Sequence, residues 1–240
     1  YYYSTYEPFQ DDGVDHVPNL DKRDKQRMVA IGSGPIRIGQ GIEFDYGCVH
    51  AVMAIRSAGM DAVLINNNPE TVSTDFDTSD RLYFDPLTSE CVSEILLREK
   101  AHGILLQFGG QTAINLAQPI EKRLTHLASK GADVQILGTS VDGIDEASDR
   151  ERFEAFAKKH GLRMPNGATG TTADDIRKAV DSIGFPVLIR PSYVLGGRGM
   201  EILSNETQLE AYLKEAYLAP DKPLLVDEYL GHATELDVDA

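Results

Sequence analysis

The sequence is short of the residues that cross-link or anchor a protein. It holds two cysteines, Cys48 and Cys91, among 240 residues. Two cysteines cannot build a disulfide framework, so we expect a reducing compartment and predict a cytoplasmic protein. No apolar run approaches the roughly 20 residues that a membrane helix needs, and residues 1–10 lack the basic and apolar regions of a secretory signal. Neither a membrane partner nor secretion is therefore expected.

Basic residues are also scarce, because 23 Lys and Arg stand against 38 Asp and Glu, a formal net charge of −15. Such a surface repels the phosphates of nucleic acids, so no nucleic-acid partner is expected. An anionic small ligand is not excluded, since a few local arginines can hold a phosphate. The 6 histidines show no metal-ligand spacing with one another or with the cysteines.

The chain does contain a regular alternation of short apolar strands and helical stretches. Strands are predicted at residues 28–31, 62–65, 103–106 and 134–137, with a helix after each of the first three. This alternation predicts an α/β fold with a Rossmann-like parallel sheet and helices on its faces. Pro119 lies inside the third helical pattern and is expected to kink or shorten that helix.

The first predicted helix has its apolar stripe at Val49, Val52 and Met53 and stops near Gly59. Cys48 lies on this helix among apolar neighbours. We interpret it as a packing residue and not as a nucleophile.

The pattern changes near residue 140. Residues 148–151 have the sequence of a capping box, which predicts the start of a helix that ends at Gly161. Further elements are a helix from residue 172, strands at 187–189, 200–203 and 224–226, and a helix between the last two strands. We therefore predict a tail at residues 1–26, a Rossmann-like domain at 27–139 and a second, incomplete domain at 140–240.

The first glycine-rich stretch, Gly32 to Gly39, follows a strand, as a dinucleotide-binding turn does. Its third glycine falls five residues after the second, and the next strand ends in three asparagines with no acid for a ribose hydroxyl. We therefore favour a tight strand-to-helix turn over a nicotinamide site.

The second glycine-rich stretch, Arg190 to Gly199, lies between two strands and lacks the lysine–serine pair of a Walker motif. It predicts a hairpin flap whose tip, at Gly196 and Gly197, lets backbone N–H groups approach a phosphate chain. Arg190 can supply a fixed positive charge to the same phosphates. A surface hairpin with a flexible tip is the alternative.

The strand at 224–226 runs into polar Glu228 and apolar Leu230, an arrangement that suits an adenine ring. Glu235, Asp237 and Asp239 then alternate with apolar residues, which places their carboxylates on one face of a strand. One or more of them could contact a ribose or a metal-bound phosphate. A solvated sheet face is the favoured alternative for Asp237 and Asp239. No residue is assigned a catalytic role.

Four segments, in this order, resemble the large subunit of carbamoyl-phosphate synthetase. They are Ile36-Arg-Ile-Gly-Gln-Gly-Ile-Glu-Phe-Asp45, Asn67-Asn-Pro-Glu-Thr-Val-Ser-Thr-Asp75, Gln107-Phe-Gly-Gly-Gln-Thr112 and Arg190-Pro-Ser-Tyr-Val-Leu-Gly-Gly197. The resemblance covers nearly the whole chain. It implies two homologous halves, each with a Rossmann-like pre-ATP-grasp domain followed by an ATP-grasp domain. Because Tyr3 to Glu7 resemble the end of the helical domain between the halves, the chain is similar to the start of the second half.

The resemblance implies that the complete enzyme transfers a phosphoryl group from ATP, with Mg²⁺ or Mn²⁺, to carbamate that derives from bicarbonate. It also implies a hetero-oligomer with a glutaminase small subunit, serving arginine and pyrimidine synthesis. Another ATP-grasp carboxylase or amine ligase is one alternative. A non-catalytic nucleotide-binding module is the other.

The matching segments also imply the residues of an ATP site. Arg150 and Arg190 would contact phosphates, with Gly196 and Gly197 in the flap above them. The remaining contacts would be Glu228 and Leu230 at the adenine and Glu235 at the ribose. Metal ligands are expected only downstream of Ala240, so we expect no turnover from this chain alone.

Overall fold

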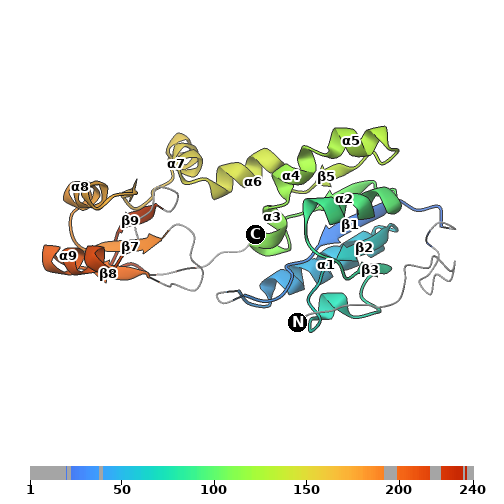
Figure 1. Cartoon of the computed structure of the whole chain (residues 1–240), viewed down its shortest axis with the longest axis horizontal. Helices are drawn as coiled ribbons and strands as arrows, with labels where there is room; N and C mark the ends of the chain where they lie inside the picture. Colours follow the sequence, from blue (N-terminus) through green and yellow to red (C-terminus); the bar gives the residue numbers. More distant parts are fainter. Residues whose placement is uncertain are drawn as a thin grey trace. The chain divides into compact units, whose positions relative to one another are not determined.

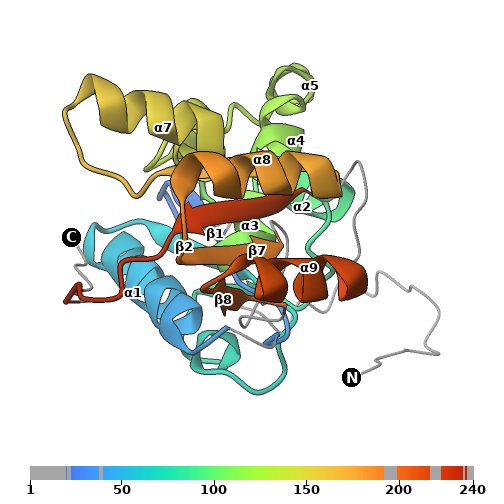
Figure 2. The same ribbon diagram turned by 90° about the vertical axis from the view of Figure 1, so that its left-hand side faces the viewer.

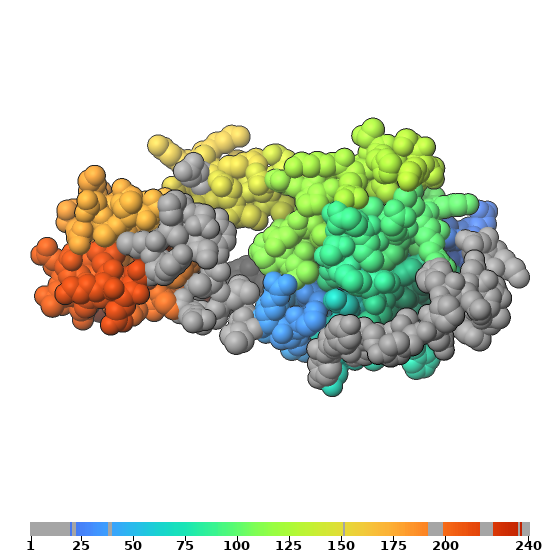
Figure 3. Space-filling view, in the orientation of Figure 1, coloured from blue at the N-terminus to red at the C-terminus, as the bar shows by residue number. Residues whose placement is uncertain are grey.

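The structure is a computed structural model that describes residues 20, 23–37, 40–191, 199–216, 223–234 and 236, coloured in Figures 1 and 3. These residues form two compact units: the chain passes from the first to the second between Asp145 and Glu146, and the short segment Arg37–Gln40 is also grouped with the second unit. Each unit has its own sheet and its own buried core. The domain boundaries expected at residues 26 and 139 remain predictions. Among the described helices, none is long and apolar enough to cross a membrane.

The first unit is built on a 5-stranded sheet with the order β3-β2-β1-β4-β5, in which every neighbouring pair is parallel (Figure 1). The first strand lies at the centre and the chain crosses over to both sides of it, as in a doubly wound fold. Its elements are β1 (Arg27–Ile31), α1 (Glu43–Ser57), β2 (Asp61–Ile65), the 3-10 helix η2 (Val72–Thr74), β3 (Arg81–Tyr83), α2 (Ser89–Arg98), β4 (Gly103–Leu105), α3 (Gly110–Ile114), α4 (Ala117–Glu121), α5 (Leu124–Ser129) and β5 (Gln135–Leu137).

The core of this unit has two layers, because successive side chains of a strand point to opposite faces of the sheet. Val29 and Ile31 of β1 are buried in a cluster with apolar residues of α2, α4 and α5. Met28 and Ala30 are buried with residues of α1. The sheet is therefore covered on both faces, which explains why its strands are nearly continuous apolar runs.

Four of these strands confirm the sequence predictions. β3 was missed because the strand is only three residues long, begins with the polar Arg81 and is only half buried. The helix expected after β4 is divided into α3, α4 and α5. Pro119 lies in the first turn of α4, where a missing N–H removes no intrahelical hydrogen bond. The predicted shortening is thus confirmed.

The apolar stripe predicted for α1 is partly wrong. The helix buries Cys48, Ala51, Val52 and Ile55, whereas Met53 is exposed. The buried residues also follow the 3.6-residue helical period, but their stripe begins one residue before the predicted stripe. Cys48 packs in the core as expected.

The second unit is built on a 4-stranded antiparallel sheet with the order β6-β9-β7-β8. Its core lies between one face of this sheet and the apolar sides of α8 and α9, which Figure 2 shows beside the strands. Its elements are α7 (Arg150–Lys159), β6 (Gly167–Gly170), α8 (Ala173–Ile183), β7 (Val187–Pro191), β8 (Glu201–Leu203), α9 (Glu206–Glu215) and β9 (Leu224–Glu228), and α6 (Val141–Ser148) precedes them.

The β7–β8 hairpin confirms the predicted pairing of the strands that flank the second glycine stretch. β6 was missed because Gly-Ala-Thr-Gly has little strand propensity. The capping box predicted at residues 148–151 is wrong. Ser148 ends α6, and Asp149 caps α7 by accepting a hydrogen bond from the backbone N–H of Arg152 at 2.9 Å.

A buried ion network joins α2 to the sheet. The Glu99 side chain, fully buried just after α2, accepts from Arg27 at 3.3 Å, from Arg81 at 2.6 Å and from the Tyr83 hydroxyl. Burial and the hydrogen bond to Glu99 raise the pKa of Tyr83 to about 12. One carboxylate therefore connects the first residues of β1 and β3 to the end of a helix.

We predict that Glu99→Ala lowers the free energy of unfolding of the first unit by about 3–5 kcal/mol, because it removes the carboxylate that two buried guanidinium groups share. Urea unfolding followed by circular dichroism measures the change. The control is Glu90→Ala, which removes an exposed partner of Arg123 and should leave the unfolding midpoint nearly unchanged. Equal effects of the two substitutions would contradict a structural role for Glu99.

Candidate functional site

The centre of the candidate site is Asp227 on β9, which forms ion pairs with two arginines. Its Oδ1 lies 2.5 Å from Nη2 of Arg150, and its Oδ2 lies 3.4 Å from Nε of Arg190. Arg150 also binds Glu154 of α7 at 2.9 Å. The structure therefore brings together the two arginines that were predicted to contact phosphates, although they lie 40 residues apart in the sequence.

The strand register explains why the three side chains meet. Arg190 pairs with Leu225 in the antiparallel ladder of β7 and β9. Directly paired residues point to the same face, and so does the residue two places along, Asp227. Arg150 reaches the same face from the first position of α7. Since α8 and α9 pack on the opposite face, this face presents the arginines at the surface of the unit, with Arg190 44% exposed.

Gly167 on β6 makes room for the ion pair between Arg150 and Asp227. A Cβ atom at this position would overlap Nη2 of Arg150 and would lie 2.5 Å from Oδ1 of Asp227. The glycine therefore allows the close approach of these two side chains, which a Cβ atom here would force to shift. Sequence reasoning missed both Gly167 and Asp227, because only the pairing of β6, β9 and β7 shows what they contact.

Apolar side chains surround the arginines on this face of the sheet. Leu188 of β7 pairs with Ile202 of β8, which is 47% exposed, and Leu225 of β9 lies across from Arg190. Apolar surface beside fixed positive charge can accept a ligand that has both a flat ring and an anionic group.

Glu228 lies apart from the arginines. It follows Asp227 in β9, so its side chain is on the other face, where it accepts hydrogen bonds from the backbone N–H and the Nδ2 of Asn166 at 3.2 and 2.9 Å. Leu230 follows the strand and is half exposed. Contacts of these two residues with an adenine remain predictions. Gly196, Gly197 and Glu235, like Asp237 and Asp239, lie outside the described residues.

In the first unit, the asparagines that follow β2 hold the glycine turn that follows β1. Asn66 accepts from the backbone N–H of Gly34 at 3.0 Å and donates to the Ser73 hydroxyl at 3.0 Å. Ser73 in turn donates its backbone N–H to Asp45 at 3.3 Å. Asn66 thus occupies the place where a dinucleotide-binding fold carries an acid for the ribose, and it supports the turn instead.

The turn after β4 touches the same glycine turn. A Cβ atom at Gly109 would lie 2.6 Å from the Ile31 carbonyl oxygen and would also overlap that of Gly32. Four polar atoms on residues near this edge of the sheet are buried without a hydrogen-bond partner among the described residues: Asp45 Oδ1, Asn67 Oδ1, Gln107 Oε1 and Thr112 Oγ1.

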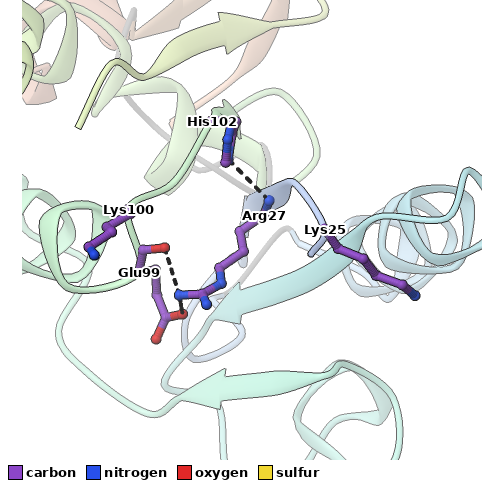
Figure 4. A pocket seen from close by; sticks show the side chains of 5 residues that line it. All are labelled: Lys25, Arg27, Glu99, Lys100 and His102. Atoms are coloured by element: carbon purple, nitrogen blue, oxygen red, sulfur yellow. Dashed lines mark hydrogen bonds and ion pairs between the residues drawn. The ribbon is translucent and has the colours of Figure 1, made fainter. Parts of the chain in front are cut away.

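A hollow of about 360 Å³ lies at the opposite edge of this sheet, where β1 and β4 begin. It is lined by Lys25, Arg27, Glu99, Lys100 and His102 (Figure 4). The side chains of Lys25 and Lys100 point to opposite sides in this view, and Arg27 is bound to Glu99. The positive charges do not converge, so we assign no ligand to this hollow.

The described residues offer no metal-binding group of three or more His, Cys, Asp or Glu side chains. Cys48 is an unreactive thiol, because burial and the nearby Asp45 carboxylate raise its pKa to about 12.

Comparison with known proteins identifies the family. Residues 24–146 match the family described as "Carbamoyl phosphate synthase preATP-grasp domain". Residues 149–240 match "Carbamoyl-phosphate synthase L chain, ATP binding domain". The chain belongs to the carbamoyl phosphate synthase large-chain family. The resemblance found in the sequence, and the fold class that it implied, are confirmed.

Relatives in this family are similar along the whole chain. The carbamoyl phosphate synthase large chain of Methanothrix thermoacetophila is 50% identical over 241 residues, which is 100% of this chain and 21% of that protein. The large chain of Myxococcus xanthus is 50% identical over 240 residues, again 100% of this chain and 21% of that protein. The chain thus spans about a fifth of the length of these relatives.

Solved structures show the fold. N5-carboxyaminoimidazole ribonucleotide synthetase from Thermus thermophilus superimposes with a TM-score of 0.59 at 16% identity, covering 85% of this chain and 47% of that one. The biotin carboxylase domain of Hydrogenobacter thermophilus 2-oxoglutarate carboxylase superimposes with a TM-score of 0.59 at 23% identity, and the match covers 87% of this chain and 45% of that one. In this carbamoyl phosphate synthase family member, the Arg150–Asp227–Arg190 cluster lies within the match to the ATP-binding domain.

We predict that Gly167→Ala lowers the free energy of unfolding of the second unit by about 1–2 kcal/mol, because the new methyl group separates Arg150 from Asp227. The loss should appear although Gly→Ala usually stabilises by roughly 0.4–1 kcal/mol through the unfolded chain. Chemical denaturation measures it.

The matched control is Gly231→Ala, whose Cβ would make an ordinary 3.4 Å contact with Tyr229. It should leave the unfolding midpoint unchanged or raise it. If Gly167→Ala does the same, the ion pair contributes nothing to stability.

Proposed function

We propose that this chain carries the phosphate-binding part of an ATP site in the second half of a carbamoyl phosphate synthase large chain. The observation that carries the proposal is the shared ion pairing of Arg150 and Arg190 with Asp227 on the open face of the second sheet. The match of this region to an ATP-binding domain supports it. Further support comes from the β7–β8 hairpin, whose connecting segment includes Gly196 and Gly197.

Asp227 acts in this proposal as a positioning residue. A guanidinium group has five N–H donors, so each arginine can stay bound to Asp227 and still donate to a phosphate oxygen. The side chains are then already oriented before the nucleotide arrives. Fixed positive charge of this kind stabilises the negative charge on a phosphoryl group in transfer.

We further propose that the complete protein phosphorylates carbamate, with ATP as the phosphoryl donor, to give carbamoyl phosphate and ADP. The relatives with 50% identity are carbamoyl phosphate synthase large chains, which favours this acceptor over that of another ATP-grasp carboxylase or amine ligase. The Hydrogenobacter domain was solved with MgADP, which supports a magnesium nucleotide as ligand.

The wider setting of the enzyme is part of the same proposal. It is a cytoplasmic hetero-oligomer with a glutaminase small subunit, it serves arginine and pyrimidine synthesis, and Mg²⁺ or Mn²⁺ binds to residues outside this chain. The two free cysteines support a reducing compartment. The family resemblance supports the rest.

We predict that the isolated chain forms no carbamoyl phosphate from ATP, bicarbonate and ammonia, because it spans about a fifth of the length of its relatives. A coupled assay with ornithine transcarbamoylase measures the product. Product formed above the level of a heat-inactivated sample would overturn this expectation.

We predict that MgADP binds the chain and that Arg190→Ala weakens binding roughly tenfold or more, because a charge-assisted hydrogen bond to phosphate is lost. Isothermal titration calorimetry measures both affinities. Arg177→Ala is the matched control, since Arg177 pairs with Glu210 and Asp174 on the helices of the same unit. Equal affinities of the Arg190→Ala and Arg177→Ala proteins would show that Arg190 does not contact the nucleotide.

A further inference from the structure

Asn166 and Glu228 hold each other at one end of the second sheet. Asn166 directly precedes β6, and Glu228 is the last residue of β9. The backbone N–H of Glu228 donates to the Asn166 carbonyl oxygen at 2.7 Å. Oε2 of Glu228 accepts from the backbone N–H and from Nδ2 of Asn166, at 3.2 and 2.9 Å. These hydrogen bonds restrict a glutamate side chain that is otherwise among the most flexible.

One of these bonds departs from the antiparallel ladder. Two residues that form a hydrogen-bonded pair normally exchange two bonds, because each N–H donates to the carbonyl oxygen of the other. Asn166 and Glu228 continue the register in which Gly167 pairs with Asp227. Glu228 donates as this register requires, but the N–H of Asn166 donates to the Glu228 side chain. The carboxylate therefore takes the place of the Glu228 carbonyl oxygen as the acceptor.

The Glu228 carbonyl oxygen is left open as a result. Tyr229 donates its N–H to the Pro186 carbonyl oxygen at 3.1 Å, on the β7 side of β9. Successive residues of a strand direct their backbone groups to alternate sides, so those of Glu228 point away from β7. Among the described residues, neither the carbonyl oxygen of Glu228 nor the N–H of Leu230 has a hydrogen-bond partner. An acceptor and a donor two residues apart are thus open at the end of β9.

We propose that Asn166 is a positioning residue for the base of the nucleotide. By binding the Glu228 carboxylate, it keeps the Glu228 carbonyl oxygen free to accept a hydrogen bond from the amino group of a purine. The inference rests on the proposed ATP site, in which the adenine is predicted to lie at Glu228 and Leu230. It goes further because it makes the choice of base depend on a side chain that does not itself touch the nucleotide.

The two open backbone groups distinguish adenine from hypoxanthine. Adenine carries an amino donor at C6 beside an acceptor at N1, whereas hypoxanthine carries an oxygen at C6 beside an N–H at N1. A carbonyl oxygen and an N–H suit the first pattern and oppose the second. If the N–H of Asn166 returned to the Glu228 carbonyl oxygen, as in a regular ladder, it would compete with the purine amino group and the discrimination would fall.

Nucleotide titration of the 240-residue chain tests the proposal. Isothermal titration calorimetry compares MgADP with magnesium inosine diphosphate (MgIDP), which differs from it only in the base. The parent protein should prefer MgADP roughly tenfold or more. Asn166→Asp has the same shape but sets a second carboxylate beside Glu228, so it should expel that side chain and reduce the preference by a factor of roughly three or more.

Two further variants separate positioning from a change of charge. Asn205→Asp adds the same charge to the same unit at the N-cap of α9, where aspartate caps as well as asparagine, and it should keep the preference of the parent. The double variant Asn166→Asp, Glu228→Gln should restore the preference, because the glutamine amide can donate to the new carboxylate and still accept from the backbone N–H. A double variant with no restored preference would overturn the proposal.

Arg190→Ala distinguishes this inference from the proposed function. Both nucleotides carry the same phosphates, so this substitution should weaken MgADP and MgIDP equally and keep their ratio. If Arg190→Ala does so while Asn166→Asp leaves the preference unchanged, only the role of Asn166 is overturned. Equal weakening of both nucleotides by Asn166→Asp, with a lower unfolding midpoint, would show a structural role and overturn it too, as would no preference in the parent. No binding of MgADP to the parent would contradict both proposals.

Discussion

The antiparallel pairing of β7 with β9 is the interaction on which the candidate site depends. It sets Arg190 across from Leu225 and so places Asp227 on the same face of the sheet. A shift of one residue in the register of β9 would point the Asp227 side chain into the apolar core between the sheet and its helices. An unpaired carboxylate is strongly disfavoured there. Burial of Val226 and Leu224 on the opposite face therefore fixes the position of the charged residues.

The first unit shows the same dependence of polar groups on an apolar framework. Parallel pairing of β1 with β2 and β4 brings the ends of these strands to one edge. There Asn66 supports the glycine turn after β1, and Gly109 lets the turn after β4 approach it. Both contacts are made by residues between the elements, yet the sheet register decides whether they meet.

Much of this could be predicted from the sequence, since most of the strands are short apolar runs bounded by glycine or polar residues. β3 and β6 could not be predicted, because these short strands, which begin with Arg81 and Gly167, show no alternation of apolar and polar residues. Helix termini were harder than helices: Asp149 and Ser148 both can cap a helix, and only tertiary structure decides between them. The family resemblance pointed to Arg150 and Arg190. It could not show that one carboxylate holds both.

That shared carboxylate has an electrostatic consequence. Arg150 and Arg190 carry two positive charges, and their partners Asp227 and Glu154 carry two negative ones. The resting cluster is thus close to neutral within a protein of charge −15. A small monovalent anion gains little by competing with two carboxylates already in contact with the guanidinium groups. If the cluster binds phosphates as proposed, a chain of phosphates, with several charges and many acceptor oxygens, gains more than a monovalent anion does, which would favour a polyanion at this site.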